Sequence, residues 1–240
     1  MQAIILAAGR GSRMGEFTKD IPKPLIQIGG KTIMEHILDA LHACGIFDVI
    51  VVVGYKGSII EDTIGSRYKN CMLTYIFNKD FKKSDNLYSL WLAHKYVTSN
   101  GMIFLNGDTI FHESILRHLI EDSCKDGLIA SVSAGEEKNP IVIHEDRGRI
   151  VEIGHSISLE VNGVASGLYK LSQETSASYF KEAEKVFANG PQKGGFVIPI
   201  QRLASSIHFQ AIRSEDRRWI NINTPSDRER ACGIIAEIIT

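Results

Sequence analysis

The residues best suited to do chemistry lie in two short segments near the start of the chain. Residues 6–14 read LAAGRGSRM, and residues 22–25 read PKPL. The glycines of the first segment allow backbone N–H groups to approach a phosphate closely. Arg13 offers a planar fork suited to phosphate oxygens, and Lys23, between two prolines, is a rigidly placed point charge. These residue types at this spacing predict a binding loop for a nucleoside triphosphate.

Two better-known glycine loops do not fit this segment. The dinucleotide fingerprint needs a glycine where Met14 stands, and the P-loop pattern needs a G-K-[ST] ending that is absent. The simplest alternative is a glycine turn with solvated basic residues nearby. The complete pattern, with Arg13 and Lys23 in place, favours triphosphate binding over that alternative.

A third chemical group follows a later apolar run. Residues 102–105 are apolar and lead directly into Asn106, Gly107 and Asp108. An aspartate at the carboxyl end of a buried strand can reach a metal ion in the ligand crevice. A turn-forming or helix-capping aspartate is the alternative interpretation.

Alternating elements must position these groups. Apolar runs at 3–8, 49–53, 73–77 and 102–105 are separated by helical patterns at 32–44, 57–67 and 86–97. This order predicts an α/β fold with a doubly wound, mostly parallel, Rossmann-like sheet. Ligands bind such sheets beyond the carboxyl ends of the strands, so the order brings the glycine loop and Asp108 together.

The second half of the chain has a different pattern. Strands are predicted at 128–134, 140–144, 149–153, 164–171, 207–212 and 219–222, with a hairpin turn at 146–148 and helices near 173–188 and 194–205. The last helix should begin after Thr224 as its N-cap, with Asp227 three residues later. We expect one domain over residues 1–240, with a nucleotide-binding half at 1–110 and an acceptor-side half at 111–240, which includes a smaller acceptor-side lobe and the second metal ligand.

The composition excludes several classes of protein. The net charge is -1 over 240 residues, without the basic excess of a nucleic-acid binder. The four cysteines show no C-x-x-C pair, and no apolar run reaches membrane-spanning length. We therefore expect a cytoplasmic protein with small-molecule partners, without nucleic-acid or membrane partners. The oligomeric state cannot be read from the sequence.

The two segments that open the chain closely resemble the signature of the sugar-nucleotidyltransferase-like superfamily. That signature is L-A-A-G-x-G-[ST]-R-[LM] followed by P-K-[PA]-[LM]. The resemblance covers essentially the whole chain and implies transfer of a nucleoside monophosphate from an NTP to a phosphorylated acceptor, with release of pyrophosphate. It also implies Mg²⁺ bound by Asp108 and by Asn223 or Asn221, although many relatives carry aspartate where this chain has asparagine.

Residues 78–90 refine the expected nucleotide. Their N-L-Y-S-L core is similar to a segment of CTP-dependent cytidylyltransferases of the phosphocholine, aminoethylphosphonate and inositol-phosphate types. The resemblance implies CTP and a phosphocholine-like or similar acceptor. The alternatives are a sugar-1-phosphate uridylyl- or thymidylyltransferase and a non-catalytic nucleotide-sensing module.

These considerations assign expected roles to individual residues. Catalysis is expected of Arg13 and Lys23. Nucleotide binding is expected of Leu6, Ala7, Ala8, Gly9, Gly11, Ser12, Arg13, Asn78, Ser84, Asn86 and Asp108. Acceptor binding is expected of Lys23, Asp85, Tyr88 and Tyr169. A quaternary amine would be bound by an aromatic or acidic cage, for which Tyr88, Trp91, Tyr169 and Asp85 are available. A carboxylate-bearing acceptor would instead be bound by a cation such as Lys170, Lys193 or Arg213.

Overall fold

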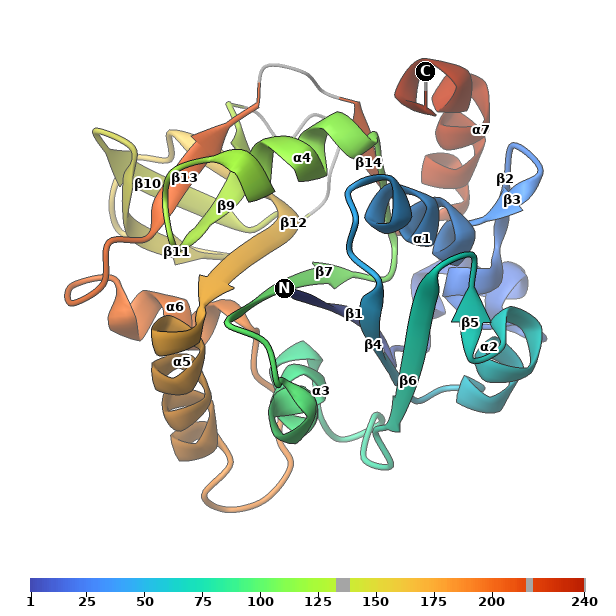
Figure 1. Cartoon of the computed structure of the whole chain (residues 1–240), viewed down its shortest axis with the longest axis horizontal. Coiled ribbons are helices and arrows are strands. Elements are labelled where there is room, and N and C mark those ends of the chain that lie inside the picture. Colours follow the sequence, from blue (N-terminus) through green and yellow to red (C-terminus); the bar gives the residue numbers. More distant parts are fainter. Residues whose placement is uncertain (133–138, 215–217, 240) are drawn as a thin grey trace.

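Two apolar cores, one on each face of a central sheet, organise the protein. Figure 1 shows this sheet with helices on both sides. The computed structural model describes residues 1–132, 139–214 and 218–239. Strand β1 (Gln2–Ala7) is buried along its whole length and lies near the middle of the sheet. Successive side chains of a strand point to opposite faces, so Ile5 packs into one core and Ile4 into the other. This explains why the strand is a continuous apolar run.

The first half of the chain forms the parallel part of the sheet. Its strands in spatial order are β7 (Gly101–Asn106), β1, β4 (Asp48–Val53) and β6 (Cys71–Phe77), and all three pairings are parallel. A short antiparallel strand, β5 (Arg67–Tyr68), lies at the edge. Because β4 and β7 lie on opposite sides of β1, the strand order reverses between β1 and β7. Such a switch point is where open α/β sheets bind ligands.

The second half corrects the prediction of a mostly parallel sheet. Its strands are β9 (Gly127–Ser131), β10 (Val142–Asp146), β11 (Arg149–Gly154), β12 (Gly163–Ser172) and β13 (Gln210–Arg213). They extend the first half into one mixed ten-stranded sheet, in which β12 joins β7 antiparallel. An additional β10–β12 pairing closes these five strands into a ring. The predicted hairpin turn is confirmed, and a tight hairpin can only join antiparallel strands.

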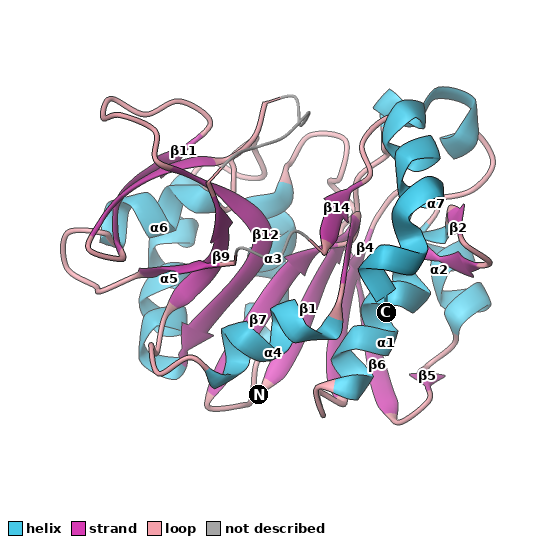
Figure 2. Ribbon diagram, turned by 90° about the horizontal axis from the view of Figure 1, so that it is seen from above, coloured by secondary structure: helices cyan, strands magenta, loops and turns pink. Residues whose placement is uncertain are grey.

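Helices cover both faces of the mixed sheet (Figure 2). One face carries α1 (Ile33–Ala43), α2 (Gly57–Ile64), α4 (Glu113–Glu121) and α7 (Pro225–Ile239). The other carries α3 (Asn86–Leu92), α5 (Gln173–Val186) and α6 (Val197–Leu203). Three short 3-10 helices are η1 (Ser12–Thr18), η2 (Lys23–Leu25) and η3 (Ala93–Tyr96). Helix α4 was not predicted. Helix α1 lies within one residue of the predicted 32–44 at each end. Helix α3 begins at residue 86 as predicted but ends at Leu92, five residues early, where η3 continues to Tyr96.

Two short ribbons complete the fold. The pair β2 (Gln27–Ile28) and β3 (Lys31–Thr32) precedes α1, and β8 (Thr109–Phe111) pairs antiparallel with β14 (Trp219–Asn221). The second ribbon brings the C-terminal segment beside the end of β7. Thr224 caps α7 as predicted, because its Oγ1 accepts from Asp227 N at 3.2 Å. No helix among the described residues is long and apolar enough to cross a membrane.

Candidate active site

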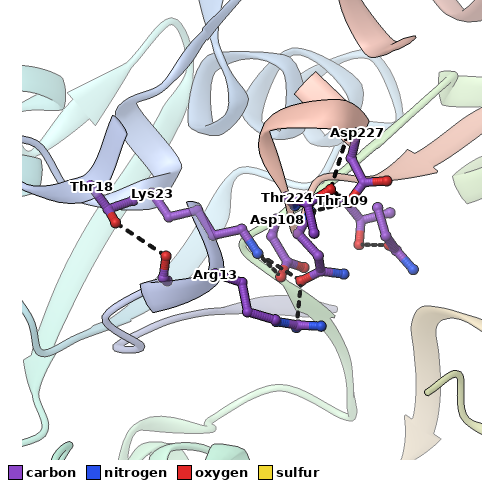
Figure 3. A network of polar contacts seen from close by, with 10 residues as sticks. Arg13, Thr18, Lys23, Asp108, Thr109, Thr224 and Asp227 are labelled. Carbon is purple, nitrogen blue, oxygen red and sulfur yellow. Dashed lines mark hydrogen bonds and ion pairs between the residues drawn. The ribbon is translucent and has the colours of Figure 1, made fainter. Parts of the chain in front are cut away.

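The glycine loop after β1 is shaped to pack against Lys23. Gly11 has φ of 66°, a conformation that residues with a side chain rarely adopt. A Cβ at this position would lie 3.0 Å from Lys23 Cβ, so only glycine leaves room for the lysine stem. Thr18 Oγ1 donates to the Gly11 carbonyl at 3.1 Å and ties η1 back onto the loop (Figure 3).

Lys23 lies at the centre of a polar cluster. Its Nζ donates to Asp108 Oδ2 at 2.6 Å and to Asn223 Oδ1 at 2.9 Å (Figure 3). Arg13 donates to the same Asn223 oxygen at 2.8 Å. Lys23 is only 8% exposed, which is unusual for a lysine and requires such partners. Four residues that the sequence analysis selected from three distant segments therefore meet in one cluster: Arg13, Lys23, Asp108 and Asn223.

Close backbone approach places Asp108 at the switch point. Gly107 N donates to the Leu6 carbonyl at 2.9 Å, and a Cβ on Gly107 would lie 2.8 Å from that same oxygen. On the other side, Ile222 N donates to the Asp108 carbonyl at 2.9 Å. The aspartate is thus held between the end of β1 and the β8–β14 ribbon.

The two asparagines of the C-terminal segment are not equivalent. The carbonyl oxygen of Asn221 accepts from Thr109 Oγ1 at 2.6 Å, so it is already engaged within the ribbon. The carbonyl oxygen of Asn223 instead faces the two cations. Of the two asparagines, only Asn223 has its side-chain oxygen beside the position that the Lys23 ammonium group occupies next to Asp108.

The cluster lies in the wall of a cleft of about 560 Å³. The predicted residues that line it are Leu6, Ala7, Gly9, Gly11, Ser12, Arg13, Lys23, Asp85, Asn86, Asp108, Asn221 and Asn223. The other wall was missed and comes mostly from the second half, with Asn139, Ile141, His155, Ala165, Gly167, Gly195, Phe196 and Val197. Pro24, Asn106 and Gly107, beside predicted positions, also line the cleft. No local motif distinguishes the missed second-half residues in the sequence.

Three residues predicted to bind the nucleotide lie behind the cleft wall. Ala8 is buried, and its carbonyl accepts from Tyr55 N at 3.0 Å. Asn78 is 1% exposed, and its amide donates to the hydroxyls of Ser84 and Ser89 at 3.1 and 3.0 Å. Asn78 and Ser84 hold the 78–86 loop together through these hydrogen bonds, and none of the three residues lines the cleft.

Two residues predicted to bind the acceptor are also placed elsewhere. Tyr169 is fully buried and stacks on Phe104, with ring centroids 4.6 Å apart. Tyr88 packs edge-on against Phe187 and does not line the cleft. Tyr169 belongs to the apolar core and the half-buried Tyr88 packs against it, because strand β12 and helix α3 turn these faces toward that core.

The alternative cations are likewise engaged elsewhere. Lys170 donates to the Asp122 carbonyl at 3.0 Å, and Arg213 pairs with Glu145 at 2.7 Å. Lys193 is not among the residues that line the cleft, and neither is Trp91. Of all the residues proposed to recognise the far end of the acceptor, Asp85 alone lies in the cleft wall described here.

The donor set suits a divalent cation only in part. Within residues 1–132, 139–214 and 218–239, no group of three or more His, Cys, Asp or Glu side chains could hold a metal. Asp108 and Asn223 offer one carboxylate and one amide oxygen beside a position now taken by an ammonium group. Mg²⁺ commonly uses one or two carboxylates and fills its remaining positions with substrate phosphates and water. The residues therefore fit a metal that is shared with a bound triphosphate.

Known proteins are similar to this chain in sequence and in fold. The chain is 34% identical over 119 residues to CMP-5'-(3-aminopropyl)phosphonate synthase of Streptomyces rubellomurinus, covering 50% of this chain and 19% of that protein. It is 29% identical over 158 residues to UTP–glucose-1-phosphate uridylyltransferase of Haloferax volcanii, covering 64% of each chain. The match therefore spans less than two thirds of either relative.

Structural similarity extends over the whole chain. The solved structure of the inositol-1-phosphate CTP transferase from T. maritima matches with a TM-score of 0.80 at 21% identity, covering 100% of this chain and 97% of that one. At this identity the match shows the shared fold. A family model described as a MobA-like NTP transferase domain matches residues 3–158, well over half of the chain. The protein belongs to this nucleotidyltransferase family.

Proposed function

We propose that the protein transfers CMP from CTP to a small phosphorylated or phosphonate acceptor and releases pyrophosphate. The observation that carries the proposal is the cluster of Arg13, Lys23, Asp108 and Asn223 in the wall of the cleft. Two anionic substrates must approach each other in such a reaction. Placed cations with a metal-competent carboxylate are the groups that this chemistry needs.

Lys23 and Arg13 would contact different phosphates of the triphosphate. The attacking group is an acceptor phosphate oxygen, which is already ionised and needs no general base. Lys23 is placed to neutralise the α-phosphoryl and acceptor oxygens, and Arg13 to hold the departing β- and γ-phosphates. Mg²⁺, when bound by Asp108 and Asn223 together with the triphosphate, supplies further charge compensation. The main contribution of the chain is then positioning of the two substrates.

The cleft also favours one kind of acceptor. Asp85 and Phe196 lie in its wall, whereas Lys170 and Arg213, two of the cations suggested for a carboxylate-bearing acceptor, are paired elsewhere, and the third, Lys193, does not line the cleft. A carboxylate near Asp85 would be repelled, while an amine would be attracted. We therefore favour an acceptor whose far end is an amine or is neutral, and the aminopropylphosphonate relative agrees with this choice.

A second function has a specific observation in its favour. The uridylyltransferase relative from Haloferax volcanii shares 29% identity over 158 residues. Transfer of UMP to a sugar 1-phosphate would use the same cationic cluster. The two functions differ in the base wall near Asn86 and in the acceptor.

Initial rates of pyrophosphate release decide between them. CTP, UTP and dTTP are compared at one sub-saturating concentration, each with phosphocholine, 2-aminoethylphosphonate and glucose 1-phosphate. We expect CTP to exceed the other nucleotides in kcat/KM by at least about tenfold, because a base site that accepts from the cytosine amino group leaves a buried acceptor unpaired with uracil. Asn86→Ala should erode this preference without abolishing turnover. A clear preference for UTP or dTTP with a sugar phosphate would establish the second function instead.

A further inference from the structure

The ammonium group of Lys23 lies where a divalent cation would sit between Asp108 and Asn223. Its Nζ is 2.6 Å from Asp108 Oδ2 and 2.9 Å from Asn223 Oδ1. These are the two oxygens that the chain offers for a metal. A metal ion cannot contact both oxygens while the ammonium group remains between them.

The lysine is held in this position by its surroundings. The stem packs against Gly11, where even a Cβ would lie 3.0 Å from Lys23 Cβ and 3.2 Å from its Cδ. Pro22 and Pro24 restrict the backbone on either side. With 8% of its surface exposed, Lys23 has few alternative positions in the free protein.

The local charge also opposes a metal. Among the four residues of the cluster, Lys23 and Arg13 are cations and Asp108 is the one carboxylate. A second carboxylate, Asp227, accepts from the backbone N of Asn223 at 3.0 Å and is itself paired with Arg230 at 3.0 Å. Within the cluster, two cations against one anion leave a positive balance, to which a divalent cation would add two more charges. A triphosphate reverses this balance, because its phosphates attract both the metal and the two side chains.

We propose that Lys23 keeps the divalent cation out of the free protein, so that the metal enters only together with the nucleoside triphosphate. The triphosphate draws the ammonium group from Asp108 to a phosphate oxygen, and this exchange frees the carboxylate for the metal. Lys23 thereby sets the order of binding as well as stabilising the transferring phosphoryl group. The inference rests on the metal requirement of the proposed function, but on neither the base nor the acceptor.

Titration of Mn²⁺ into the protein without nucleotide tests this order. The electron paramagnetic resonance signal of free Mn²⁺ reports the bound fraction. We expect Lys23→Met to bind Mn²⁺ at least about tenfold more tightly than the unaltered protein, and Mn²⁺ to raise the Tm of the variant alone. Adding Asp108→Asn to Lys23→Met should remove the gain. Lys185→Met, which removes an exposed lysine on α5, is the matched control and should change nothing.

Each result decides the proposal. Equal Mn²⁺ affinity in the unaltered protein and Lys23→Met overturns it. Mn²⁺ binding that stays tighter when Asp108→Asn is added to Lys23→Met overturns it as well. Should Lys23→Met not fold, Lys23→Gln, which keeps a hydrogen-bond donor for Asp108, gives the same comparison. The titration contains neither CTP nor acceptor. A tenfold gain in a protein that fails every transfer assay would contradict the proposed function alone, and turnover without the gain would contradict this inference alone.

Discussion

The two walls of the cleft are built by different kinds of structure. The first half supplies loops at the carboxyl ends of parallel strands, and these loops carry Arg13, Lys23 and Asp108. The second half supplies residues within or beside antiparallel strands, such as Ala165 and Gly167 of β12. The first wall carries the charges of the reaction, and the second gives the cleft its shape. Substitutions in the two walls should therefore affect different steps.

The largest expected effect comes from the first wall. Lys23→Ala should lower kcat/KM for the acceptor by at least about 100-fold, because a charge-assisted contact that strengthens in the transition state is lost. Steady-state rates at saturating nucleotide measure this, with Lys185→Ala as the control. Turnover close to that of the unaltered protein would remove Lys23 from the catalytic residues.

The next largest effect is expected from Asp108→Asn, which should lower kcat/KM by about 30- to 100-fold at a few millimolar Mg²⁺. The substitution keeps an oxygen beside the metal position but removes the charge that attracts the ion. Rates measured across a range of Mg²⁺ and Mn²⁺ concentrations should show partial recovery at high metal. A loss that no metal concentration relieves would point to a structural role for the carboxylate.

Asn78→Ala tests the support behind the first wall. The buried amide donates to Ser84 and Ser89 and accepts from Asp80 N, so its removal leaves polar partners unsatisfied. The free energy of unfolding should fall by about 1–3 kcal/mol, measured by urea denaturation. Asn70→Ala, at an exposed turn, is the matched control. Unchanged stability in both variants would contradict the role assigned to Asn78.

A smaller effect is expected from the second wall. His155 lines the cleft with its Nδ1 3.1 Å from the Pro140 carbonyl, whereas His144 makes a similar contact to Glu160 outside the cleft. We expect His155 to make one hydrogen bond to the acceptor, whose loss corresponds to about 2- to 10-fold. His155→Ala should raise the acceptor KM by this factor and leave the CTP KM unchanged, while His144→Ala changes neither. Equal effects on both KM values would show that the walls are not functionally separate.

The smallest expected effect concerns the stability of the second half. The Arg213 guanidinium, 2.7 Å from the carboxylate, holds the pKa of Glu145 below its usual value. A lowered folded pKa gives stability that is present above about pH 4.3 and is lost as pH falls through the folded value. Glu145→Gln should lower the Tm by about 1–3 °C at pH 7, and the difference should close in acid. A difference that is constant with pH would exclude this ion pair as its cause.

The contrast between the two walls of the cleft also explains which features the sequence could predict. Strand β1 is a continuous apolar run followed by a glycine loop, so its burial, position and chemistry are all encoded locally. Residues Ile141, His155 and Gly167 come together only because β10, β11, β12 and β13 close into a ring with β9. That closure depends on long-range pairing, which leaves no local pattern.

Side-chain direction was the other source of error. Tyr88 and Tyr169 are aromatic residues near the expected pocket, and the sequence could not show that both turn toward the apolar core. Asn78 lies in the segment that resembles cytidylyltransferases, but its side chain is buried and donates to Ser84 within the loop. The resemblance of residues 78–90 thus pointed to a segment of which Asp85 and Asn86 line the cleft, but it could not indicate which side chains face the cleft.

The most direct test of the central claim is the identity of the bond that forms. The protein is incubated with CTP, Mg²⁺ and 2-aminoethylphosphonate or phosphocholine, and phosphorus NMR follows the products. The account predicts a pair of coupled signals from a new P–O–P linkage between the CMP and acceptor phosphorus atoms, with one pyrophosphate released for each linkage. The same sample with Lys23→Ala should form the linkage at least about 100-fold more slowly. Pyrophosphate release with free CMP and no coupled signals, at equal rates in both proteins, would contradict the account.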